Sequence, residues 1–239
     1  MRTGLFAGLL TTFIATLLGV RAYAGEPAGG TEAVIATFSI VGCDPATGEV
    51  GAAVASMYPA VGKVVPFVRA GAGAFCSQYH HNPQFGPKAL VMLEAGMRPE
   101  DILAALLRDD KKPDYRQLAI IDLQGRAANR NPTAADENGL WWGGATGRHY
   151  AVQGNTLAGR TVIVAMAAGY EAAEGTVADK LMAALEAGDH SGGDHRGRLA
   201  AGLRVAKPGV DGLWIEIDVD ESDDAVNELM KKYKAWKSK

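Results

Sequence analysis

Apolar residues fall into short runs along this chain, and turn signals separate one run from the next. The first run of the main body covers residues 34–43, and a second covers residues 49–56. The stretch between them begins and ends with turn-forming residues and therefore predicts a hairpin; it reads Asp44-Pro45-Ala46-Thr47-Gly48. Both runs are apolar at successive rather than alternate positions. Strands of that kind belong to sheets that are covered on both faces.

The rest of the pattern predicts a mixed α+β fold with two stacked sheets and helices outside them. Prolines open two of the predicted helices and glycines close two, as is common at helix ends. The last helix begins near Ser222 and ends in lysines, which suits the helix dipole. Residues 130–147 are predicted to form an irregular loop. The other helices are expected at 87–95, 99–107, 160–172 and 176–187, and further strands at 63–69, 72–78, 116–122, 149–153, 198–206 and 213–219.

The first 24 residues have the features of a Sec-type signal peptide. Arg2 forms the positive region, residues 4–20 form an uncharged apolar run, and Ala22-Tyr23-Ala24 is a small-x-small cleavage site. A transmembrane anchor is the alternative, but the run is short for a span of about 20 residues and a cleavage motif follows it at once. We therefore expect a periplasmic or secreted protein without a stable membrane anchor. Its parts are a signal peptide at 1–24, a leader at 25–36 and one domain at 37–239.

Charge and cysteine content narrow the classes of partner. The formal net charge is -3 and basic residues gather only in the last helix, so nucleic acid is not an expected partner. Cys43 and Cys76 are too few for a disulfide scaffold, and both lie in apolar strand-like runs. We expect two buried thiols, with a single bridge between them as the alternative. The histidines of His80-His81 and of the loop 189–195 are weak metal candidates, because adjacent histidines do not converge on one ion in an extended chain. Neither a metal nor a cofactor is expected.

Ten segments, taken in order along the chain, resemble one family. They are Thr37-Phe38-Ser39-Ile40-Val41, residues 44–48, Ala60-Val61-Gly62, Val64-Val65-Pro66, residues 69–74, Asn82-Pro83-Gln84-Phe85-Gly86-Pro87, Arg116-Gln117, Gln153-Gly154-Asn155, Leu157-Ala158-Gly159 and residues 192–198. Together they resemble DUF1028, an uncharacterised family of the Ntn-hydrolase superfamily, some of whose members carry a fimbrial assembly label. Each segment is weak alone, but the ordered series runs from residue 37 to about residue 220.

The resemblance implies a four-layer αββα sandwich and a threonine nucleophile at the start of the mature chain, which matches Thr37. At the level of the superfamily it also suggests a homodimer. A threonine hydroxyl needs a base to take its proton, and an N-terminal threonine carries one in its own α-amine. The unperturbed pKa of that amine, about 7.7–8.0, suits proton transfer near neutral pH.

This chemistry requires the bond between Ala36 and Thr37 to be cut, because a nitrogen inside a peptide bond is not basic. Cleavage after Ala24 leaves residues 25–36 attached, whereas Val34-Ile35-Ala36 offers a second acceptable cleavage triplet. In the alternative interpretation Thr37 is only a β-branched strand residue.

Four other residues are candidates for the same site. Asp194 could orient the amine or simply pair with Arg196 in a turn. Gln78 and Asn155 carry neutral amides that could stabilise an oxyanion, bind a substrate carbonyl or fix a loop. Ser77, where the family favours threonine, is a weaker candidate for substrate binding.

The chain also departs from the family pattern near this presumed pocket. Trp142-Gly143-Gly144-Ala145 lacks the histidine of a Trp-Ala-Gly-His motif, and Leu199-Ala200 replaces Gln-Ser. Lost polar groups indicate an altered substrate or a member without activity. Two functions therefore stay open: an exported amidohydrolase acting on a small-molecule or peptide-like substrate, or a non-catalytic exported protein that uses the scaffold for binding or assembly.

Overall fold

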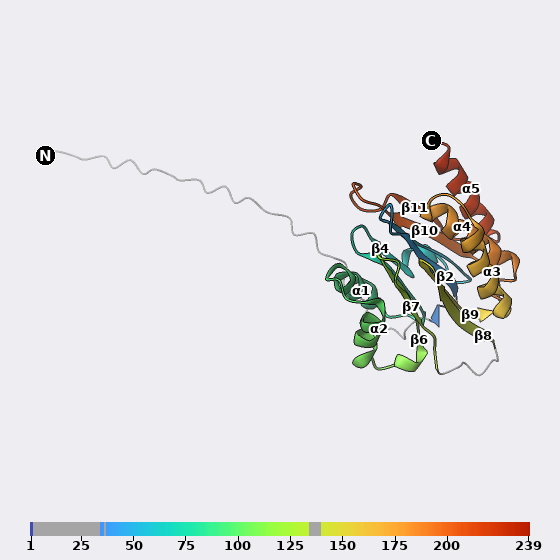
Figure 1. Cartoon of the computed structure of the whole chain (residues 1–239), viewed down its shortest axis with the longest axis horizontal. Coiled ribbons are helices and arrows are strands. Elements are labelled where there is room, and N and C mark those ends of the chain that lie inside the picture. Colours follow the sequence, from blue (N-terminus) through green and yellow to red (C-terminus); the bar gives the residue numbers. More distant parts are fainter. Residues whose placement is uncertain (2–33, 36, 134–139) are drawn as a thin grey trace. The chain divides into compact units, whose positions relative to one another are not determined.

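Two antiparallel sheets lie face to face in the computed structural model, which describes residue 1 and residues 34–35, 37–133 and 140–239 (Figure 1). The five-stranded sheet contains β1 (Val34–Ile35), β4 (Pro66–Arg69), β5 (Gly73–His80), β6 (Arg116–Asp122) and β7 (Ala127–Arg130). The six-stranded sheet has the order β11 (Ile215–Val219), β10 (Ala200–Ala206), β3 (Glu49–Ser56), β2 (Thr37–Asp44), β9 (Tyr150–Leu157) and β8 (Trp141–Gly147).

Helices cover the outer face of each sheet. The five-stranded sheet packs against α1 (Phe85–Glu94) and α2 (Pro99–Arg108). The six-stranded sheet packs against α3 (Arg160–Ala172), α4 (Val177–His190) and α5 (Ala225–Lys237). Short 3-10 turns, η1 (Val61–Lys63) and η2 (Pro113–Tyr115), precede β4 and β6. The predicted α+β sandwich of two sheets with outer helices is confirmed.

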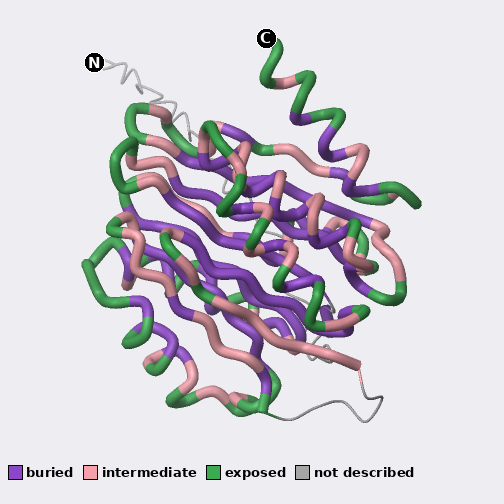
Figure 2. The backbone as a smooth tube through the Cα atoms, turned by 45° about the vertical axis from the view of Figure 1, so that its right-hand side comes forward, coloured by how far each residue is buried: buried purple, intermediate pink, exposed green. Residues whose placement is uncertain are grey.

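The two faces of each strand enter different layers of this sandwich. In β2, Phe38 and Ile40 join the apolar cluster beneath α3 and α4, whereas Val41 and Cys43 join the cluster between the sheets. Figure 2 shows both sheets buried along most of their length, with most exposed positions in turns and on helices. The prediction of strands covered on both sides is therefore correct.

The layer between the sheets is apolar at one end and polar at the other. By alternation, the inner positions of β2 continue from Val41 and Cys43 back to Ser39 and Thr37. The inner positions of the other central strands change in the same way. At the polar end they are Ser56, Gln78, Gln117, Gln153 and Asn155, all buried. The fold thus gathers buried hydroxyl and amide groups at one end of its central layer.

The prediction of one continuous strand over 34–43 is wrong. Val34–Ile35 pairs with β5 in one sheet, whereas Thr37–Asp44 pairs with β3 and β9 in the other. The chain therefore passes from one sheet to the other between Ile35 and Thr37. An apolar run satisfies either sheet equally well, so periodicity alone does not show the crossing.

The prediction of an irregular loop over 130–147 is also wrong in part. Residues 134–139 lie outside the described residues, but Trp141–Gly147 forms β8 at the edge of the six-stranded sheet. Glycines that resemble a loop signal are needed here for close packing. A Cβ atom on Gly144 would lie 2.6 Å from Asn129 Nδ2 and 2.7 Å from the Val152 carbonyl oxygen.

The ends of several other helices and strands agree with those predicted from the sequence. The predicted spans of β3, β6 and α3 coincide with the observed ones, whereas α4 continues past Gly188 to His190. Gly188 is therefore a helical position and not the end of α4, and glycine fits there because a Cβ atom would lie 2.5 Å from Met166 Cγ. None of the helices in the described ranges combines the length and apolarity that a membrane span requires. The expected signal peptide at 1–24 lies outside these ranges, apart from Met1.

Asp179, in the first turn of α4, forms hydrogen bonds with side chains of α5. Its carboxylate accepts from the Thr176 backbone N–H in a capping box, and also from Tyr233 Oη at 2.9 Å and Lys237 Nζ at 2.6 Å. Burial alone would raise the pKa of Asp179, but these hydrogen bonds, that of Lys237 first, lower it to about 2.

Asp179→Asn should therefore remove an acid-dependent part of the stability. The folded pKa lies below the ordinary value of 3.8, so the wild-type contribution is present above about pH 4 and is lost as the pH falls toward about 2. Urea unfolding at about pH 6 and pH 3 should show the variant destabilised by about 2 kcal/mol at the higher pH and by less at the lower. The matched control Lys234→Met, an exposed change on α5, should keep the wild-type pH dependence. If Asp179→Asn loses the same amount of stability at both pH values, the lowered pKa of Asp179 is not the source of the acid-dependent stability.

Candidate functional site

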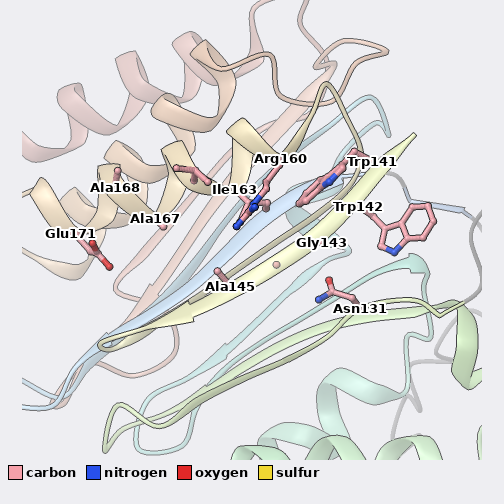
Figure 3. A pocket seen from close by; sticks show the side chains of 12 residues that line it. Asn131, Trp141, Trp142, Gly143, Ala145, Arg160, Ile163, Ala167, Ala168 and Glu171 are labelled. Carbon is pink, nitrogen blue, oxygen red and sulfur yellow. The ribbon is translucent and has the colours of Figure 1, made fainter. Parts of the chain in front are cut away.

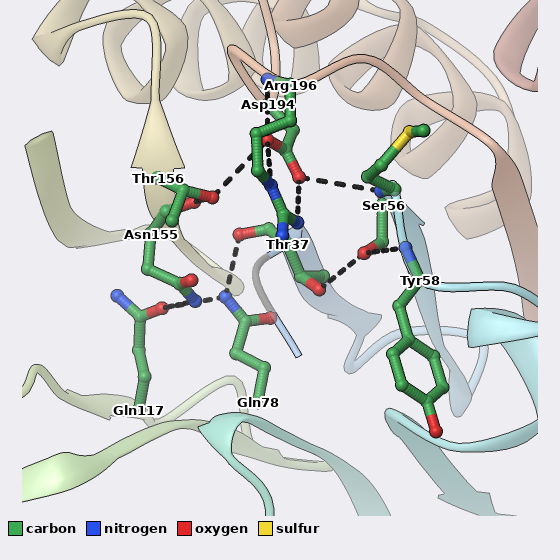
Figure 4. A network of polar contacts seen from close by, with 10 residues as sticks. Thr37, Ser56, Tyr58, Gln78, Gln117, Asn155, Thr156, Asp194 and Arg196 are labelled. Carbon is green, nitrogen blue, oxygen red and sulfur yellow. Dashed lines mark hydrogen bonds and ion pairs between the residues drawn. The ribbon is translucent and has the colours of Figure 1, made fainter. Parts of the chain in front are cut away.

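Thr37 is the first residue of β2 and is fully buried at the polar end of the central layer. Its hydroxyl donates to Ser56 Oγ, 3.1 Å away on the neighbouring strand, where the two residues are register partners (Figure 4). Ser56 Oγ also accepts from the Tyr58 backbone N–H at 2.8 Å. Two strands of one sheet therefore fix the position of the Thr37 hydroxyl.

Gln78 reaches Thr37 from the facing sheet. Its Nε2 donates to the Thr37 carbonyl oxygen at 3.1 Å and to Gln117 Oε1 at 2.8 Å, while its Oε1 accepts from Ser39 Oγ at 2.6 Å. These contacts use both hydrogens of the Gln78 amide. Gln78 thus holds the strand that carries Thr37, rather than leaving donors for a substrate.

Gln117 stands at the centre of the amide network. Its Oε1 accepts from Asn155 Nδ2 at 2.8 Å as well as from Gln78, and its Nε2 donates to the Gly154 carbonyl at 2.8 Å and to Asn131 Oδ1 at 3.0 Å. All three amide side chains are almost fully buried. In a low-dielectric interior such a network is strong and rigid.

Asn155 has unused hydrogen-bonding capacity, as has Gln153, a buried amide of the same layer whose Oε1 also lacks a partner among the described residues. Asn155 is 2% exposed, and within the described part of the chain its Oδ1 has no hydrogen-bond partner. Asn155 also lines a cavity of about 10 Å³ together with Tyr79, Thr156, Trp142, Pro132 and Leu140. That volume holds about one water molecule. The space beside Asn155 is therefore too small for a substrate.

Asp194 is 1% exposed and lies close to both Thr37 and Ser56 in Figure 4. Its carboxylate pairs with Arg196, at 2.7 Å from Nη2 and 3.1 Å from Nε, and accepts from the Thr156 hydroxyl at 3.3 Å and the Met57 backbone N–H at 3.4 Å. The Asp–Arg turn considered from the sequence is present. Asp194 ties the end of β3 to the end of β9, next to the strand that carries Thr37.

Two strained residues flank the network. Tyr79 on β5 and Thr156 on β9 have positive φ angles of 63° and 52°. For a β-branched residue such as threonine this conformation is a genuine outlier. Backbone strain of this kind costs about 1–3 kcal/mol and is concentrated at functional sites. Each strained residue directly follows an amide of the network, Gln78 or Asn155.

The structure brings together three of the sequence candidates, Thr37, Gln78 and Asn155, and places Asp194 beside them. Ser77 is not part of the network, since alternation turns it to the opposite face of β5 from Gln78. Sequence reasoning gave no role to Gln117, Ser39 or Ser56. Their signal was present: each is a polar residue at an inner position of a strand that is otherwise apolar.

Both cysteines are buried thiols, 3% and 0% exposed, and are not bonded to each other. Burial raises the pKa of each thiol to about 12. Because the thiolate is the reactive form, neither cysteine is suited to act as a nucleophile at neutral pH.

A larger cavity of about 550 Å³ lies between β8 and α3, on the outer face of the six-stranded sheet (Figure 3). Trp141, Trp142 and Arg160 line it, with Glu171 at its far end. Asn131 connects it to the amide network through its bond to Gln117. Thr37 is not among its lining residues. Across the described ranges, no group of three or more His, Cys, Asp or Glu side chains is arranged to hold a metal ion.

Comparisons with known proteins place this geometry in a family. The model described as "Family of unknown function (DUF1028)" matches residues 37–229. The crystal structure of protein SPO2555 from Silicibacter pomeroyi, which carries the same family designation, is similar with a TM-score of 0.75 and 30% sequence identity. That match covers 84% of this chain and 88% of the other. A search of curated proteins gives no match.

Proposed function

We propose a function for this chain from the premise that it belongs to the DUF1028 family. The protein is an exported amidohydrolase of the N-terminal-nucleophile type, and its mature form begins at Thr37. The observation that carries the proposal is the placement of Thr37, which heads a central strand with its hydroxyl fixed by Ser56. The family match also begins at this residue.

The hydroxyl of Thr37 needs a base, and Ser56, its hydrogen-bond partner, is not one at neutral pH. Cleavage of the bond between Ala36 and Thr37 converts the backbone amide of Thr37 into an amine. That amine is attached to the same Cα atom as the side chain, so it needs no further positioning relative to the hydroxyl. Ser56 holds the hydroxyl oxygen in place through the bond described above, and the hydroxyl proton turns from Ser56 to the amine before it is transferred.

The reaction then runs in two balanced steps. The amine takes the hydroxyl proton as Thr37 Oγ1 attacks the carbonyl carbon of the substrate, and it passes that proton to the leaving nitrogen as the amide bond breaks. The acyl group is then held as an ester on Thr37. Water, activated by the same amine, hydrolyses the ester, and the carboxylic acid leaves.

Asn155 and Gln78 have different roles in this scheme. Asn155 has an unpartnered Oδ1 and one hydrogen bond from Nδ2, so it has an acceptor and a second N–H for the substrate. A neutral N–H directed at the carbonyl oxygen stabilises the charge that develops there. Gln78 positions Thr37 by holding its carbonyl. Asp194 acts from further away, by fixing the loop that follows Ser56.

The cavity beside Trp141 and Trp142 supports a second function, that of a non-catalytic exported binding protein. It has space for a small ligand, whereas the space at the amide network does not. On this alternative, residues 25–36 stay attached and Thr37 is a buried strand residue.

N-terminal sequencing of the protein recovered from its export compartment tests the proposal. We expect the mature chain to begin at Thr37, since only that form has the required amine. Intact-mass measurement of the same sample provides an independent check of the cleavage position. A mature chain that begins at Gly25 and still hydrolyses amides would refute the mechanism. An inactive form with residues 25–36 attached that binds a ligand would favour the binding protein.

A further inference from the structure

The outer edge of β5 is paired with two different segments. Over its first half, from Gly73 to Cys76, it pairs with β4. The Ser77 N–H then donates to the Val65 carbonyl oxygen at 3.2 Å. Beyond that point the edge pairs with β1, in the register Ile35 with Tyr79 and Val34 with His80. The part of the edge next to the amide network is therefore covered by the leader.

β1 lies on this edge as an extended peptide would. Its two residues run antiparallel to β5, with the Ile35 side chain buried and the Val34 side chain directed outward, at 1% and 47% exposure. Ile35 belongs to the apolar cluster between the sheets. The edge thus supplies backbone pairing and an apolar site for one side chain, the two elements of recognition by strand addition.

Cleavage before Thr37 disconnects β1 from the domain. A two-residue strand without a covalent connection has little to hold it, because so short a pairing is marginal in water. Its departure opens the edge at Tyr79 and His80 and empties the space filled by Ile35. The unpartnered Oδ1 of buried Asn155, which shares a small cavity with Tyr79, lies beside the opened edge.

We infer that the mature enzyme acts on extended peptides, which bind to β5 in the place that β1 leaves. This inference rests on the proposed function of Thr37. One residue separates Ile35 from Thr37, so a peptide running in the same direction presents the carbonyl of its third residue to the Thr37 hydroxyl. The amide bond after that residue is broken, the acyl peptide is held on Thr37 as an ester, and water releases it.

The register also predicts the sequence preference. The residue before the one that carries the cleaved carbonyl corresponds to Ile35 and is large and apolar. The residue before that one corresponds to exposed Val34 and is unrestricted. The mature protein should therefore prefer peptides that end in Val-Ile-Ala before the cleaved bond.

Three fluorogenic aminomethylcoumarin amides, Val-Ile-Ala, Val-Asp-Ala and Asp-Ile-Ala, test this with the mature protein from the export compartment. Replacing isoleucine by aspartate loses the burial of a large apolar side chain and places a carboxylate in an apolar site. We expect kcat/KM for Val-Asp-Ala to be lower than that of Val-Ile-Ala by a factor of about 100 or more. Asp-Ile-Ala is the matched control, with the same charge at the exposed position, and it should stay within about threefold.

A small β-lactone without a peptide part separates the two proposals, because it acylates a reactive Thr37 without using the β5 edge. Acylation of Thr37 together with equal turnover of the three amides, or turnover of none, would overturn the peptide inference and leave the nucleophile in place. A chain that does not begin at Thr37, or that the β-lactone does not acylate there, would overturn both. Preference for Val-Ile-Ala and Asp-Ile-Ala over Val-Asp-Ala supports both.

Discussion

Replacing Thr37 by alanine is expected to abolish amide hydrolysis by the mature protein and to leave its fold intact. The change removes the attacking oxygen, and loss of a catalytic nucleophile typically lowers kcat by a factor of about 10⁴ or more. Thr37 is fully buried rather than an exposed strand end, so some loss of stability is also expected. Losing its hydrogen bond to Ser56 should cost about 1 kcal/mol.

Two further variants make this result specific. Thr37→Ser keeps both the hydroxyl and the amine and should retain part of the activity. Thr47→Ala removes a threonine hydroxyl from the exposed hairpin turn after β2, where it accepts from the Glu49 N–H, and should retain all of it. Activity is measured on the Val-Ile-Ala amide, and folding by circular dichroism and urea unfolding. Full activity of Thr37→Ala in a mature chain beginning at residue 37 would exclude Thr37 as the nucleophile.

Arg116→Met should give the largest loss of stability, about 3–5 kcal/mol in urea unfolding. The Arg116 side chain is 0% exposed and forms two hydrogen bonds with the Asp110 carboxylate, at 2.6 Å and 2.8 Å. It also donates to the His80 carbonyl oxygen. Methionine fills a similar volume but leaves a 5% exposed carboxylate and a backbone carbonyl without these donors. The cost comes from groups that stay buried without partners.

The surface pair of Arg69 and Glu94 is the matched control. Their side chains are 41% and 61% exposed and lie 2.9 Å apart, so Arg69→Met should cost less than about 1 kcal/mol. Because Arg116 holds the end of β5 where β1 pairs, its loss should also loosen that edge. Hydrogen exchange at Tyr79 and His80 measures this effect directly. Equal losses of stability in the two variants would show that the buried pair has no special role.

The sequence was sufficient for the parts of the fold that depend on local signals. Proline and glycine at element ends, and apolar runs on both faces, predicted α3, β3 and β6 with their observed bounds. It was insufficient where tertiary contacts determine which strand a segment pairs with. The crossing between Ile35 and Thr37 and the glycine-rich β8 depend on which strand lies alongside, and the apolar pattern does not contain that information.

The candidate site shows the same limit. Thr37 and Asn155 could be selected from the sequence because they fall in segments that resemble a family, and Gln78 because it follows Ser77, where the family favours threonine. Gln117, which bonds to both amides, lies in such a segment too, but only the facing of the two sheets shows that it connects them. Ser56 could be found only through its register with Thr37, which depends on how the hairpin pairs.

The alternation along β2 has a consequence for how this protein can evolve. Thr37 and Ser39 face the amide network, while Phe38 and Ile40 face the helices. Mutations at Thr37 and Ser39 therefore alter the polar end of the central layer without touching the packing beneath α3 and α4, and mutations at Phe38 and Ile40 do the reverse. Selection can therefore change the two faces of β2 almost independently of each other. A library confined to Ser39 and its cross-sheet neighbours can search for new specificities while the helical layer keeps the domain folded.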